Sequence, residues 1–148
     1  MRLAFAAPVT LLSMVVLTAC SQPERPAEPA TEPEPAVLGG VDLNQPLRVL
    51  GTEPFWAVEI TPAGLVYSGA DRPEQRAANP GPTIQGTTAV YASATDQGAA
   101  LVVTLIATEC SDGMSDRTYP LTARIEMGQE TLNGCAASVA FLNTPPLP

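Results

Sequence analysis

The side chains that could carry out chemistry are few in this chain of 148 residues. It contains three cysteines and no histidine, so a thiol nucleophile has no imidazole to activate it and zinc lacks its usual ligands. Glu109, Asp112 and Asp116 could meet around calcium, but their spacing differs from the 12-residue EF-hand loop. Paired carboxylates for glycoside hydrolysis stay open, although no motif locates them. We predict no enzymatic activity, no metal and no cofactor.

The stretch from Cys110 to Pro120 is the most distinctive polar segment, and it reads Cys-Ser-Asp-Gly-Met-Ser-Asp-Arg-Thr-Tyr-Pro. Its Asp-Gly and Ser-Asp pairs favour tight turns in which side chains bond the nearby backbone. A rigid, protruding loop loses little entropy on docking, but it serves equally as a stable corner of a domain, which is the role we favour. The candidate binding residues of this loop are Asp112, Met114, Ser115, Asp116 and Tyr119.

The second distinctive stretch is Gly51-Thr-Glu-Pro-Phe-Trp56, which contains the only tryptophan. Phe55 and Trp56 could form an aromatic anchor for a ligand, because aromatic side chains dominate many interfaces. A domain with so few aromatic residues needs its largest side chains inside, so we favour the core for Trp56.

Short strands separated by Gly, Pro, Asp and Asn must position these residues. The strand from Tyr119 to Met127 has the cleanest period-two pattern, which puts on one face Tyr119, Leu121, Ala123, Ile125 and Met127. Ala136–Ala140 would also tolerate a helical turn. Gly69–Pro82 is predicted to be a long exposed loop. Strands at this spacing indicate an all-β fold, a small antiparallel sandwich or barrel. The expected strands are Leu47–Leu50, Phe55–Ile60, Leu65–Tyr67, Thr87–Thr95, Leu101–Ala107, Tyr119–Met127 and Leu132–Phe141.

The N-terminus has the layout of a secretory signal, with Arg2 followed by an uncharged apolar run from Leu3 to Ala19. Leu17-Thr-Ala-Cys20 resembles the lipobox of bacterial lipoproteins. The resemblance implies that residues 1–19 are removed and that Cys20 is acylated and becomes the mature N-terminus. Three acyl chains would anchor it stably. An uncleaved membrane helix is the alternative, but 17 residues interrupted by proline are at the short limit.

Residues 20–40 are predicted to hold the lipidated Cys20 and a linker. Residues 21–36 contain five prolines, four glutamates and no large apolar side chain, so they cannot bury enough surface to offset chain entropy. We expect a disordered, semi-rigid spacer reaching up to ~50 Å. Residues 41–148 are predicted to form one small β domain. With Cys20 lipidated in an oxidising periplasm, Cys110 and Cys135 remain to form a disulfide.

The two distinctive stretches, followed by Asn133-Gly-Cys-Ala136, resemble a family of uncharacterised bacterial envelope lipoproteins. That family pairs Gly-x-Glu-Pro-Phe-Trp with Cys-x-Asp-x-Met-Ser, Tyr-Pro and Gly-Cys-Ala. The resemblance covers roughly Leu50 to Ala136 and implies a small β domain with one disulfide. It brings no catalytic residues. Ser21 after the acylated cysteine is similar to the pattern of outer-membrane lipoproteins.

The net negative charge of the chain limits the classes of molecule that it can bind. After removal of residues 1–19 the chain keeps six arginines, no lysine and fifteen acidic residues, so nucleic acid would repel it. A protein partner gathered by charge would be basic. We therefore expect a lipid-anchored, periplasmic or outer-membrane module that binds a partner or supports the envelope. The alternatives are an inhibitor of lysozyme-type enzymes, a structural subunit of an envelope complex and a barrel that binds a small hydrophobic ligand.

Overall fold

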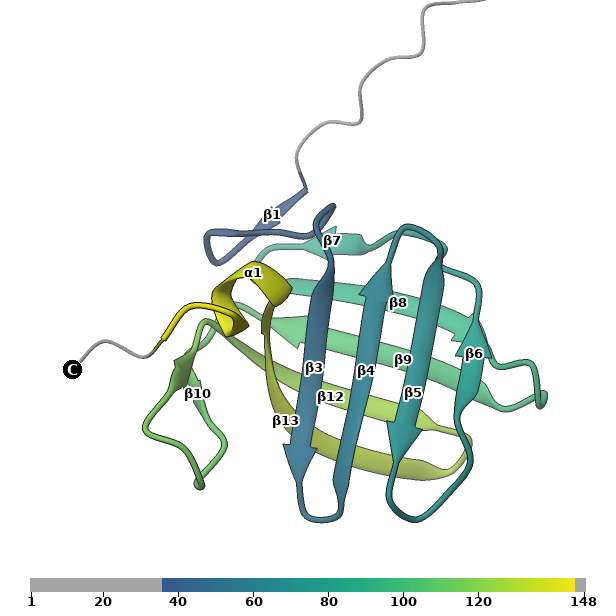
Figure 1. Ribbon diagram of the computed structural model, residues 1–148. Coiled ribbons are helices and arrows are strands. Elements are labelled where there is room, and N and C mark those ends of the chain that lie inside the picture. The colour runs from purple at the N-terminus through teal and green to yellow at the C-terminus, as the bar shows by residue number, and fades with distance from the viewer. Residues whose placement is uncertain (1–35, 146–148) are drawn as a thin grey trace, which may run out of the picture. The chain divides into compact units, whose positions relative to one another are not determined.

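The computed structural model describes residues 36–145, which form thirteen strands and one short helix (Figure 1). The all-β prediction is confirmed. The elements are β1 (Val37–Leu38), β2 (Val41–Asp42), β3 (Leu47–Thr52), β4 (Phe55–Thr61), β5 (Gly64–Gly69), β6 (Gln75–Ala77), β7 (Thr83–Gln85), β8 (Thr88–Ala94), β9 (Ala100–Ile106), β10 (Cys110–Ser111), β11 (Thr118–Tyr119), β12 (Leu121–Met127), β13 (Glu130–Ser138) and α1 (Val139–Leu142).

Nine of these strands form one antiparallel sheet in the order β6-β5-β4-β3-β13-β12-β9-β8-β7. The sheet curls so that β3, β4 and β5 face β8, β9 and β12 across a core (Figure 1). Hairpins join nearly all neighbouring strands, as the turn residues between the predicted strands require. There are two exceptions. β9 and β12 are joined through the segment that contains β10 and β11. β3 pairs with the distant β13, Leu47 with Ser138 and Leu50 with Cys135. The β3–β13 pairing brings the stretch that starts at Gly51 beside Asn133-Gly-Cys-Ala136.

The predicted long loop Gly69–Pro82 is only partly a loop. It contains β6, which pairs with β5 and buries Gln75. The other side of β6 reaches the β8–β9 turn, where Ala77 bridges Thr95 and the Asp96 amide donates to the Arg76 carbonyl at 2.7 Å. The two edge strands of the sheet, β6 and β7, are thus consecutive in the chain. Pro80 and Pro82 lie between them and have no N–H to donate to a strand pairing.

Alternation along the strands separates two apolar clusters. In β12, Leu121, Ala123 and Ile125 face the main core inside the curl. In β13, Ala136 also faces that core, whereas its neighbours Cys135 and Ala137 point to the outer face.

On that outer face, Tyr119 joins Cys135 and Ala137 in a second, smaller cluster. The period-two pattern predicted that Tyr119 shares the inward face of β12, and this prediction is wrong. Tyr119 lies on β11, which is separated from β12 by Pro120.

The folded part begins before the predicted boundary at residue 41. Val37–Leu38 pairs with Val41–Asp42 as a hairpin, and the Leu43 amide donates to the Ala36 carbonyl at 2.7 Å. Leu38 is 2% exposed and belongs to the main core. The first residues of the domain thus contribute apolar surface that the Pro/Glu-rich stretch before them lacks.

The C-terminal strand predicted over Leu132–Phe141 is β13, which begins two residues before the predicted start and ends three residues before the predicted end. β13 runs to Ser138, whose hydroxyl accepts a hydrogen bond from the Phe141 amide at 3.1 Å and caps the single-turn helix α1. The helical turn that the alanine-rich sequence would tolerate thus follows the strand at residues 139–142.

Candidate functional site

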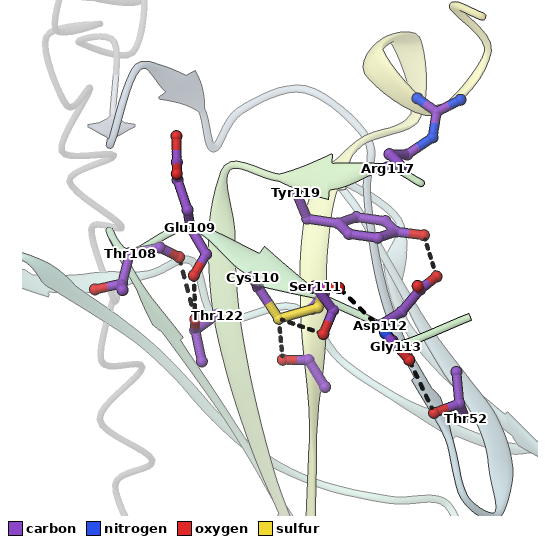
Figure 2. Close-up of a disulfide and its surroundings, with 12 residues drawn as sticks. Thr52, Thr108, Glu109, Cys110, Ser111, Asp112, Gly113, Arg117, Tyr119 and Thr122 are labelled. Carbon is purple, nitrogen blue, oxygen red and sulfur yellow. Dashed lines mark hydrogen bonds between the residues drawn. A yellow bond between two sulfur atoms is a disulfide. The ribbon is translucent and has the colours of Figure 1, made fainter. Parts of the chain in front are cut away.

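The loop from Cys110 to Tyr119 lies outside the curled sheet, beside β13. It begins in β10 and returns in β11, and the two short strands pair with each other. The predicted disulfide between Cys110 and Cys135 is confirmed, with 5.5 Å between the two Cα atoms, and it ties the loop to β13 (Figure 2). Cys110 Sγ also lies 3.4 Å from the Gly134 carbonyl oxygen. Because an oxidised sulfur carries no proton, this is a contact and not a hydrogen bond.

Asp112 organises the interior of this loop. Its Oδ1 accepts hydrogen bonds from the Met114 amide at 3.0 Å and the Ser115 amide at 2.8 Å. Its Oδ2 accepts from the Ser115 hydroxyl at 2.9 Å. It also accepts from the Tyr119 hydroxyl at 2.9 Å (Figure 2). Gly113 takes a left-handed conformation with φ of 70°, which glycine adopts without steric penalty. Three of the five candidate loop residues, Asp112, Ser115 and Tyr119, therefore form one hydrogen-bonded unit.

These bonds shift two pKa values. The backbone amides of Ser115 and Met114 stabilise the carboxylate and lower the pKa of Asp112 to about 2. Burial of the ring, and then the hydrogen bond to Asp112, raise the pKa of Tyr119. At neutral pH the unit is thus an ionised carboxylate that accepts from a neutral phenol. All four hydrogen bonds come from residues of the loop itself, so the carboxylate is held in place and is charged at neutral pH.

Met114 and Asp116, the two remaining candidates, point to solvent. Met114 is 67% exposed. The loop is held from a second side by Thr52, whose hydroxyl donates to the Asp112 carbonyl at 3.4 Å. Thr52 pairs with Phe55 across the β3–β4 turn, so both project from the same face of the sheet. Phe55 is 61% exposed. Phe55 is therefore placed on the same side of the domain as the loop.

A hollow of about 290 Å³ lies between the loop and the outer face of β3 and β13. Leu50 and the disulfide form apolar parts of its wall, and Thr52, Asp112 and Asn133 add polar groups. The loop, the β3–β4 turn and this hollow together form one continuous surface that segments far apart in the sequence build.

Arg117 was not among the predicted site residues, although it lies in the loop. Its guanidinium donates to the Phe141 carbonyl at 3.0 Å and the Thr144 carbonyl at 2.8 Å, and it lies 5.3 Å from the centre of the Phe141 ring. Figure 2 shows its side chain directed away from Asp112. The partners of Arg117 are backbone groups at the end of α1, so no sequence pattern could have identified them.

Trp56 is a core residue, as the sequence favoured, and is 4% exposed. Its indole lies over Gly51, its partner in β3, and close to Gly134 in β13. A Cβ added at Gly51 would come within 2.3 Å of Trp56 Nε1, and one at Gly134 within 2.1 Å of the Leu50 carbonyl oxygen. Both distances are far shorter than any tolerated contact. Gly51 and Gly134 therefore make room for the tryptophan ring and for close strand pairing. Of the predicted aromatic anchor, Phe55 alone is available to a ligand.

Among residues 36–145, no group of three or more His, Cys, Asp or Glu side chains could hold a metal ion. The same range contains no helix with the length and apolar character needed to span a membrane. Cys20 and the signal segment lie outside the described residues. In comparisons with known proteins, no family model, no curated protein and no solved structure matches this chain.

Proposed function

We propose that this protein is a lipid-anchored, non-enzymatic binding module of the bacterial envelope, with the Cys110–Tyr119 loop as its recognition element. The signal-like N-terminus and the lipobox ending at Cys20 support the anchor. The Pro/Glu-rich stretch that follows supports a spacer holding the domain away from the lipid surface. Anionic headgroups would repel its four glutamates.

The observation that carries the recognition role is the fixed Asp112 carboxylate inside a loop closed by a disulfide. A carboxylate with a pKa of about 2 is a weak base at neutral pH, which argues against general base catalysis. Its bonds instead preset the loop, so that docking orders few additional groups. Preorganisation of this kind suits binding better than turnover.

The anchor is tested on the protein purified from membranes of the native bacterium. Intact-mass analysis is expected to show a chain that begins at Cys20 and carries acyl groups. In a Cys20→Ser variant the acyl mass should be absent, because the acylated thiol is removed. An unmodified N-terminus on membrane-bound protein would exclude the anchor.

The recognition role is tested by photo-crosslinking in cells, with p-benzoylphenylalanine placed at Met114. The matched control carries the same group at Gln85, an exposed residue on β7. A protein crosslinked from position 114 and not from position 85 is expected. Equal yields of the same products from both positions, or no product from either, would contradict a recognition loop.

Inhibition of a lysozyme-type enzyme would be a special case of this binding. It is favoured by the excess of acidic residues, because lysozymes of the animal type are basic. The lytic rate of such a lysozyme is measured at low salt with the protein in micromolar excess. An unchanged rate would remove this candidate and leave the wider proposal intact.

A further inference from the structure

The acidic side chains of the described domain that lack an arginine partner are concentrated in one region. Residues 36–145 contain eleven acidic side chains, and five of them form ion pairs with an arginine. Within this range, the six without an arginine partner are Asp42, Glu53, Asp96, Glu109, Asp112 and Asp116. Four of these six belong to the β3–β4 turn or to the residues from Glu109 to Tyr119. Arg117, the cation of the loop, is turned toward α1.

The same region carries the two most exposed large apolar side chains of the described domain. Met114 is 67% exposed and Phe55 is 61% exposed. Neither contributes to either apolar cluster. Thr52 links their two segments, since it pairs with Phe55 and donates to the backbone of the loop at Asp112. Beside them lies the hollow whose wall includes Leu50 and the disulfide. Two exposed apolar side chains thus lie in the same two linked segments as acids that no arginine neutralises.

We propose that this surface, formed by Glu53, Phe55, Asp112, Met114 and Asp116 and called here the acidic-apolar patch, docks a partner protein through a lysine- or arginine-rich segment. The inference rests on the proposed function and names the partner class of the same loop. Long basic side chains suit such a surface, because their methylene stems cover apolar groups while their charged ends reach the acids. An arginine can also stack on the Phe55 ring.

Charge complementarity selects this partner over the other surfaces of the envelope. Anionic lipid headgroups would be repelled by the three acids of the patch. A divalent cation is a poorer match, because among residues 36–145 no three acidic, cysteine or histidine side chains lie close enough to hold a metal ion. A basic protein is instead steered toward the patch, and attraction between exposed charges falls as salt rises. Binding through the patch must therefore be salt-dependent and must also need Phe55.

The test uses the full protein purified in detergent and the protein captured by crosslinking at position 114. The captured protein is identified by mass spectrometry and its affinity is measured between roughly 50 and 300 mM salt. We expect a basic partner whose affinity falls about tenfold over this range. Glu53→Gln/Asp116→Asn should weaken binding at low salt by about tenfold, and Phe55→Ser by a similar factor. Asp112 is left unchanged because the loop needs it.

The control is Glu109→Gln, which removes an acid that also lacks an arginine partner but lies outside the patch. Figure 2 shows the Glu109 side chain pointing away from Asp112. This variant should bind like the unmodified protein, and circular dichroism should confirm that all variants are folded. The inference would be overturned if the partner were acidic. It would also be overturned if the affinity changed neither with salt nor in the double variant nor in Phe55→Ser. Either result would leave a recognition loop in place. Absence of any specific crosslink at position 114 would overturn both.

Discussion

At the scale of single residues, one carboxylate accounts for the shape of the candidate site. Asp112 accepts four hydrogen bonds from three residues of its own loop. Each such bond contributes roughly 0.5–1.5 kcal/mol, and more when the acceptor is charged. No neutral side chain of similar size offers four acceptor positions in this geometry. The loop conformation therefore depends on ionisation of this residue.

The ionisation of Asp112 predicts acid sensitivity. Its pKa is about 2 in the folded protein, below the ordinary value of 3.8. Folding thus favours the charged form, so the stabilisation is fully present above roughly pH 4 and is lost as pH falls toward 2. Asp112→Asn should lower stability at neutral pH and reduce its dependence on pH over this interval. Urea unfolding of both proteins from pH 7 to pH 2 measures the effect. Parallel curves for the two proteins would show that Asp112 does not contribute.

The glycines under Trp56 provide a second prediction for single residues. Gly134→Ala should destabilise the domain by more than about 3 kcal/mol, because the new Cβ would meet the Leu50 carbonyl oxygen at 2.1 Å and open the β3–β13 pairing. Gly40→Ala is the control. A Cβ there meets nothing within 4 Å, although the positive φ of 79° is unfavourable, so a loss of about 1 kcal/mol is expected. Thermal unfolding compares the two, and equal losses would refute the steric explanation.

At the scale of elements, the disulfide fastens a two-stranded hairpin to the outside of a sheet. β10 and β11 pair only with each other, and two strands alone are marginally stable in water. The cluster of Tyr119, Cys135 and Ala137 adds little apolar area to hold them. The covalent bond is therefore expected to carry much of the attachment of the loop.

Removing the disulfide should lower the free energy of unfolding by about 3–4 kcal/mol, as expected for a loop of this length. The double variant Cys110→Ser/Cys135→Ser is compared with the oxidised protein by urea unfolding. Hydrogen exchange is expected to increase most in residues 110–119 and least in β12, which has neighbours on both sides. Uniform acceleration across the sheet would show that the bond supports the whole fold and not only the loop.

At the scale of the whole domain, the first hairpin is part of the core. Leu38→Ala should destabilise the protein by about 2–5 kcal/mol, because the side chain is almost fully buried. Val37→Ala, at an exposed neighbouring position, should change stability by less than about 0.5 kcal/mol. Chemical denaturation of the two variants checks this. Equal effects would place the start of the folded domain at residue 41, as the sequence alone suggested.

Most strands could be predicted from the sequence alone, because alternation and turn residues are local properties. The strands over Phe55–Ile60 and Leu65–Tyr67 and the shared face of Leu121, Ala123 and Ile125 followed from such patterns. The pairing of Cys110 with Cys135 followed from the number of cysteines once Cys20 was assigned to the anchor. These inferences need only near neighbours or simple counting.

Tertiary structure decided what depends on contacts between distant segments. The pairing of β3 with β13 places Gly134 under Trp56, and the curl of the sheet turned part of Gly69–Pro82 into β6. Thr52 reaches the loop because β3 ends beside it, and Phe55, the partner of Thr52 across the β3–β4 turn, is exposed on the same side of the domain. The sequence shows which side chains of a strand point to the same face. Which strands become neighbours depends on the closure of the whole sheet, and that closure set the composition of the candidate site.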